Sequence, residues 1–131
     1  MNTKEKTVTA TTLIMTAAKA EMGHYEKVIG MFKKILATTT NEVDRYKVEN
    51  DLQREQNYYN LAVDRYASAV HKHLIEMAEE TTDEFKKFTF YYAAGNLAKA
   101  IDAWNQGLIS PGKMANVAGV VAKFDHYANK N

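Results

Sequence analysis

The chain has 131 residues, of which 46% are hydrophobic and 25% charged, as is usual for one soluble globular domain. It contains no cysteine, which excludes a disulfide framework, a thiolate zinc site and a cysteine nucleophile. No stretch approaches the roughly 20 consecutive apolar residues of a membrane-spanning helix, and the threonine-rich N-terminus does not fit a signal peptide. We therefore expect a cytoplasmic protein with one all-helical domain over residues 1–131, in which residues 1–8 form a flexible tail.

Charge is unevenly distributed along the chain, although the net charge is only +1. Residues 1–37 carry six basic and three acidic side chains, residues 38–84 carry five and eleven, and residues 85–131 carry six and two. An acidic middle segment between basic flanks favours packing of these segments against one another. The same balance argues against a general electrostatic attraction to nucleic acid.

The first predicted helix runs from about residues 9–12 to residue 37, and the second from about residue 41 to residue 78. Apolar side chains in the first recur at steps of three and four, which is typical of one buried face on an α-helix. They are Ile14, Ala18, Met22, Tyr25, Ile29, Phe32 and Leu36. Thr39 and Glu42 are spaced as a capping box, which predicts the start of the second helix.

The remaining helices follow from similar signals. Thr81 and Glu84 form a second possible capping box before a helix that Gly95 could end. Residues 97–108 are again helical by pattern, and Pro111, the only proline, separates them from a last helix over residues 113–128. With no convincing strand, the fold is predicted to be all-α: an irregular helical bundle of four or five helices, with a long N-terminal antiparallel hairpin.

Three segments resemble one another. They are "GHYEKVIGMFKKIL" at 23–36, "NYYNLAVDRYASAV" at 57–70 and "GNLAKAIDAWNQGL" at 95–108. Each starts with Gly or Asn, carries an aromatic residue near its tenth position and ends on an aliphatic residue. Their starts lie 34 and then 38 residues apart.

This pattern resembles the second helix of the tetratricopeptide repeat, whose period is about 34 residues. The resemblance implies an alternative fold, an array of helix–turn–helix units. It would place turns at Gly23, Asn57 and Gly95. It would also imply close helix approach at Val28, Ala62 and Ala100, and groove-filling aromatics at Phe32, Tyr66 and Trp104.

The sequence gives little support for catalysis or metal binding. Glu21 and His24 share a helical face, and a metal site with His73 and Glu76 is conceivable if their helices are antiparallel neighbours. Scattered histidines are more often surface or interface residues, however. No phosphate-binding glycine loop or Gly-x-Ser-x-Gly elbow occurs. We therefore predict a protein that is not an enzyme and has no metal or cofactor.

Eight tyrosines are the most informative feature of the composition, because tyrosine combines a large apolar ring with a polar hydroxyl and suits contact surfaces. We predict a non-catalytic protein-binding module, a small adaptor or inhibitor, that also forms homodimers. The alternative is a binder of nucleic acid or an anionic nucleotide through lysines next to aromatics. The residues predicted to contact a partner are Tyr58, Tyr91, Trp104, Lys33, Lys34, Lys86 and Lys87.

Overall fold

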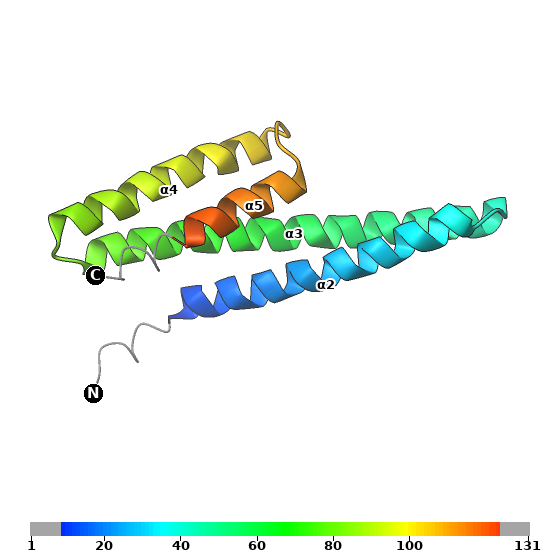
Figure 1. The fold of residues 1–131 in the computed structure, drawn as a ribbon, viewed down its shortest axis with the longest axis horizontal. Coiled ribbons are helices and arrows are strands. Elements are labelled where there is room, and N and C mark those ends of the chain that lie inside the picture. Colours follow the sequence, from blue (N-terminus) through cyan, green and yellow to red (C-terminus); the bar gives the residue numbers. More distant parts are fainter. Residues whose placement is uncertain (1–8, 124–131) are drawn as a thin grey trace.

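The computed structural model describes residues 9–123, and these residues form four helices (Figure 1). The helices are α2 (Ala10–Thr38), α3 (Glu42–Glu80), α4 (Glu84–Asn105) and α5 (Pro111–Ala122). No strand occurs in the described part of the chain, so the all-α prediction is confirmed. None of the helices found there is both long and apolar enough to act as a transmembrane segment.

Helices α3 and α4 begin at side chains that differ from the predicted capping boxes. The N-caps are Asn41 and Asp83, whose Oδ1 atoms each accept two backbone N–H bonds of 2.9 and 3.1 Å. Thr39 and Thr81 are instead the C-caps of the preceding helices. The prediction was wrong because a short Asn or Asp side chain one residue before the helix satisfies two free amides at once.

The end of α4 is set by a glycine, but not by Gly95. Gly107 has a φ of 75°, a conformation that glycine adopts without steric cost. Its N–H donates to the Trp104 carbonyl at 3.0 Å, and the Leu108 N–H donates to the Ala103 carbonyl at 2.9 Å. This pair of bonds is a Schellman motif. Ser110 then caps α5, whose first residue is Pro111.

The turns that the repeat resemblance places at Gly23, Asn57 and Gly95 do not occur. All three residues lie inside continuous helices. A single glycine costs a helix interior only about 1 kcal/mol relative to alanine, and the apolar face of each helix continues on both sides of it. The last helix begins at Pro111 rather than at residue 113. The rest of its predicted range, 124–128, lies outside the described residues.

Helix α3 is at the centre of the structure. It contacts α2, α4 and α5, and α5 also contacts α4. Figure 1 shows α2 and α4 each running alongside α3 in the opposite direction. The largest fully buried side chains lie on α3, α4 and α5 and form one core. They are Phe90, Leu74, Leu97, Met114, Val63 and Val70.

The hairpin of α2 and α3 extends beyond the other two helices (Figure 1). The last fully buried residue of α2 is Met22, and the first of α3 is Tyr59. No residue from 23 to 58 is fully buried. We call residues 23–58 the arm, and the described residues outside it the body. Arg45 closes the arm's tip, because its Nη1 donates to the carbonyls of Leu36 at 3.0 Å and Thr39 at 2.9 Å.

Candidate protein-binding surface

The outer side of α4 carries three exposed aromatic residues in a row. Phe85, Phe88 and Tyr92 are 76%, 63% and 61% exposed. Their spacing of three and four residues places them on one side of the helix. The Phe88 and Tyr92 rings stack with centroids 5.8 Å apart and an interplanar angle of 26°. We call these three residues the aromatic stripe.

The opposite side of α4 explains why the stripe faces outward. Phe90, Ala93, Ala94 and Leu97 are buried against α3 and α5. Small alanines let the helices approach closely, while Phe90 and Leu97 fill the core. This side fixes the rotation of α4 about its axis, so that the residues half a turn away project into solvent.

The predicted contact residues do not form a single surface. Tyr91 is 45% exposed and borders the aromatic stripe. Lys86 and Lys87 are half-buried in the first turns of α4. Lys33 and Lys34 are exposed on the arm, which extends away from the first turns of α4 (Figure 1).

Two predicted contact residues make their main contacts within the chain. Tyr58 is 43% exposed, and its ring lies 5.8 Å from that of Tyr25 on α2. Trp104 is half-buried against the core, and its indole Nε1 donates a hydrogen bond to Asp64 on α3. The indole therefore helps to fix α4 to α3.

The sequence analysis did not select the stripe residues as contact residues. Phe85, Phe88, Phe90, Tyr91 and Tyr92 fall within eight positions of α4 and cover several of its faces. Only the three- and four-residue steps from Phe85 to Tyr92 could have identified the stripe. That signal does not say whether the row faces solvent or the core.

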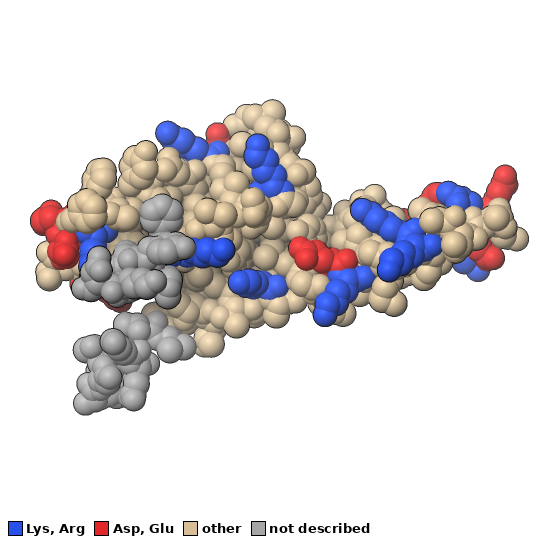
Figure 2. All heavy atoms as spheres, viewed as in Figure 1, with Lys and Arg blue, Asp and Glu red and all other residues tan. Residues whose placement is uncertain are grey.

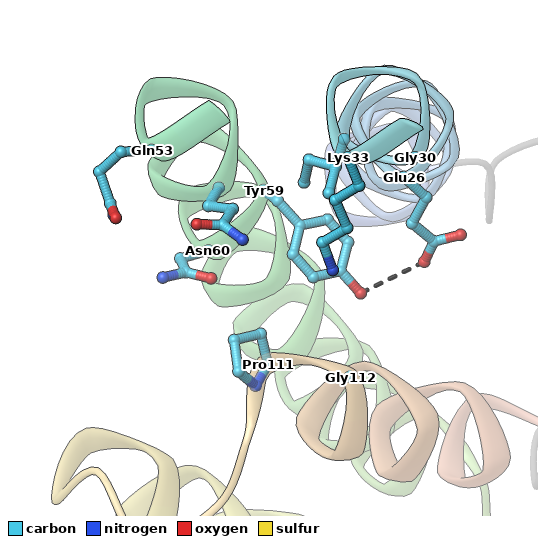
Figure 3. Close-up of a pocket in the computed structure, with 10 residues that line it drawn as sticks. Glu26, Gly30, Lys33, Gln53, Tyr59, Asn60, Pro111 and Gly112 are labelled. Carbon is cyan, nitrogen blue, oxygen red and sulfur yellow. Dashed lines mark hydrogen bonds between the residues drawn. The ribbon is translucent and has the colours of Figure 1, made fainter. Parts of the chain in front are cut away.

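A cavity of about 570 Å³ lies where the arm meets the body. Its lining comes from α2, α3 and the first residues of α5 (Figure 3). Ten residues line it: Glu26, Ile29, Gly30, Lys33, Gln53, Gln56, Tyr59, Asn60, Pro111 and Gly112. Figure 3 shows the Lys33 side chain extending toward the Tyr59 ring.

Tyr59 forms one wall of this cavity and is 9% exposed. Its hydroxyl donates a 3.2 Å hydrogen bond to Glu26 Oε1, which links α3 to α2. Burial, together with the charge and hydrogen bond of Glu26, raises the pKa of Tyr59 to about 12. The raised pKa extends the alkaline range over which the phenol stays neutral and can donate this bond.

Charged side chains do not form one broad patch on the face seen in Figure 2, where acidic groups lie among the basic ones. Glu21, which the sequence analysis considered as a metal ligand, pairs with Arg65 of α3. Among residues 9–123 no group of three His, Asp or Glu side chains is arranged to hold a metal ion.

Comparison with protein-family models, curated proteins and solved structures found no match to this chain. Functional inference therefore depends on the sequence and on the geometry of the described residues.

Proposed function

We propose that this protein is a non-catalytic protein-binding module, an adaptor or inhibitor, whose contact surface is the aromatic stripe. One observation carries the proposal: Phe85, Phe88 and Tyr92 project into solvent along one side of a helix. Aromatic residues are enriched in protein interfaces, and contiguous exposed apolar patches often mark interaction sites.

The stripe suits binding rather than chemistry. Phe85 and Phe88 carry no group that transfers a proton, attacks a substrate or holds a metal. Their rings offer a large apolar area and have few rotatable bonds, so little conformational entropy is lost on contact.

The stripe is also presented rigidly. Phe90 and Leu97, both at most 1% exposed, anchor α4 from its inner side. Asp83 caps the first turn, where the stripe begins. A surface that is already ordered before binding loses less free energy on association than a flexible one. The geometry supports recognition of an apolar helix or edge laid along α4.

Photo-crosslinking tests this proposal. A benzoylphenylalanine in place of Phe88 should crosslink to a protein in a lysate of the source cells, and mass spectrometry identifies the adduct. Leu108 is 70% exposed but lies beyond the end of α4, so the same photoreactive residue there is the matched control. Equal crosslinking from both positions, or none from position 88, would contradict the proposal.

A second candidate function is binding of an anionic nucleotide in the cavity lined by Lys33 and Tyr59. The observation that favours it is that Lys33 and the amide side chains of Gln53, Gln56 and Asn60 line the same cavity. A lysine ammonium attracts phosphate, and amides can donate hydrogen bonds to phosphate or base.

Adjacent lysines give a sharp test of the second candidate. Lys33 lines the cavity, whereas Lys34 is exposed and is not among its lining residues. Calorimetric titration with ATP at two salt concentrations should show binding that weakens as the salt concentration rises. Lys33→Glu should abolish this binding, and Lys34→Glu should largely retain it. Equal effects of the two variants would instead indicate nonspecific attraction.

A further inference from the structure

The exposed row on α4 extends beyond the aromatic residues. Phe85, Phe88, Tyr92, Gly95 and Lys99 follow one another at steps of 3, 4, 3 and 4, and all five are exposed. This is the spacing of the contact positions in a two-helix coiled coil. Phe90 lies on the opposite side of α4 and is 1% exposed. The row is therefore a complete helix-pairing face that no other described element covers.

Gly95 is not explained by packing within the chain. A methyl group added at this position would meet no atom within 4 Å, and glycine is the least favourable helix residue apart from proline. Alanine would fit here and would stabilise α4. A glycine on an exposed contact row is useful where the side chain of another molecule approaches the backbone closely.

We propose that the face from Phe85 to Lys99 pairs with the same face of a second copy of this chain, with the two α4 helices antiparallel. This inference rests on the proposed function and names the partner. If the two-fold axis crosses α4 at the level of residue 90, Phe85 lies opposite Gly95 of the other copy. Phe88 then lies opposite Tyr92. The most exposed ring, that of Phe85, thus enters the gap left by the glycine, twice in each dimer.

The charges at the two ends of this face agree with antiparallel pairing. Asp83 and Glu84 lie at its beginning, and Lys99 lies at its end. In the antiparallel register Lys99 lies about one turn beyond the level of Glu84, the first residue of α4 in the other copy. A parallel pair would place Lys99 against Lys99 and Phe85 against Phe85, which leaves both glycines facing empty space.

The exposed area indicates a reversible dimer. An aromatic residue buries roughly 150–250 Å² in an interface, and these three are about two-thirds exposed, so both copies together would hide on the order of 800 Å² of aromatic surface. Flanking residues such as Tyr91 add to this area. The total approaches the lower end of specific interfaces, about 1,200 Å². We expect a dimer that dissociates on dilution.

Sedimentation velocity over a concentration series tests the pairing. The chain should shift from monomer to dimer, and Phe88→Glu should weaken the association at least 100-fold. Leu108→Glu, a matched change at an exposed apolar residue off the face, should leave it unchanged. A chain that remains monomeric at all concentrations would overturn the inference.

Gly95→Leu tests the register, because it fills the proposed gap from a position where an added Cβ meets no atom of its own chain within 4 Å. It should maintain or raise the melting temperature of the monomer while weakening dimerisation at least 10-fold. A tighter dimer would contradict the fit of Phe85 against Gly95.

Because the chain has no cysteine, oxidation of mixed Phe85→Cys and Gly95→Cys chains gives a second measurement of the register. A disulfide should form between the two variants and not within either alone; a disulfide within either alone would contradict the register.

The crosslinker at position 88 separates failure of this inference from failure of the proposed function. An adduct with a second copy supports both. An adduct with a different protein alone keeps the protein-binding function and overturns self-pairing. The absence of any adduct, together with a monomeric chain, overturns both.

Discussion

Helices α2 and α3 run through both the body and the arm, yet the two regions differ in how completely these helices are covered. In the body, α3 is packed against α2, α4 and α5, and Val63, Val70 and Leu74 are fully buried. In the arm, α3 has only α2 beside it, and no side chain between residues 23 and 58 is fully buried. Two helices alone cannot enclose a core, because each covers only one side of the other.

This difference shows that a long helix is not equally stable along its whole length. The arm portion of α2, residues 23–38, is about 24 Å long. It is held to α3 by a partly buried edge and by Arg45 at the tip, whereas exposed ion pairs such as Arg54 with Asp51 lie within α3 itself. Exposed ion pairs contribute little, typically under about 1 kcal/mol. The arm should therefore open locally while the body remains folded.

The largest expected effect compares one substitution in the two regions. Leu74→Ala removes a fully buried side chain in the body and should lower the free energy of unfolding by about 2–5 kcal/mol. Leu52→Ala removes a half-buried side chain in the arm and should cost about 1 kcal/mol or less. Urea unfolding of both variants measures the contrast. Equal losses would show that arm and body unfold as one cooperative unit.

The two N-caps provide a comparison with matched geometry. Asn41 in the arm and Asp83 in the body each accept two backbone bonds of 2.9 and 3.1 Å. Asp83→Ala should lower global stability by about 1 kcal/mol. Asn41→Ala should mainly speed hydrogen exchange in residues 42–46 and change global stability less. If Asn41→Ala reduced the denaturant midpoint as much as Asp83→Ala, the arm would not be an independent unit.

A smaller, pH-dependent effect is expected at the junction between arm and body. Tyr59 has a folded-state pKa of about 12 against its ordinary 10.0, so the folded chain retains a proton that the unfolded chain releases. The stabilisation is complete below pH 10 and is lost as pH rises toward 12. The free energy of unfolding should therefore fall over this alkaline range, as measured by chemical denaturation at successive pH values.

Tyr59→Phe should reduce this alkaline fall, and Glu26→Gln should reduce it in part, because the charge of Glu26 contributes to the raised pKa. Some fall will remain, since burial also raises the pKa of Tyr66 in the same direction. If the free energy of unfolding of Tyr59→Phe fell with pH as steeply as that of the unchanged chain, other groups would cause the alkaline loss.

Much of the fold could be predicted from the sequence because the signals are local. The apolar steps in residues 14–36 and the polar residues near 39–42 and 81–84 predicted α2 and α3 to within a few residues. They also predicted the junctions that follow these two helices. The exact caps were missed because Thr39, Asn41 and Glu42 can each satisfy free helix amides. The resemblance at Gly23, Asn57 and Gly95 suggested turns, but glycine or asparagine within an amphipathic pattern does not by itself break a helix.

The candidate surface was less predictable, and α4 shows the reason. The sequence by itself determined that residues around 84–105 are helical and that aromatic residues lie on several sides, but it suggested an end at Gly95 that the structure does not have. Only the tertiary structure decided that Phe90 faces the core and that Phe85, Phe88 and Tyr92 face solvent. Helical periodicity identifies the buried side only when the other side is polar, so packing against α3 and α5 had to select between two apolar sides.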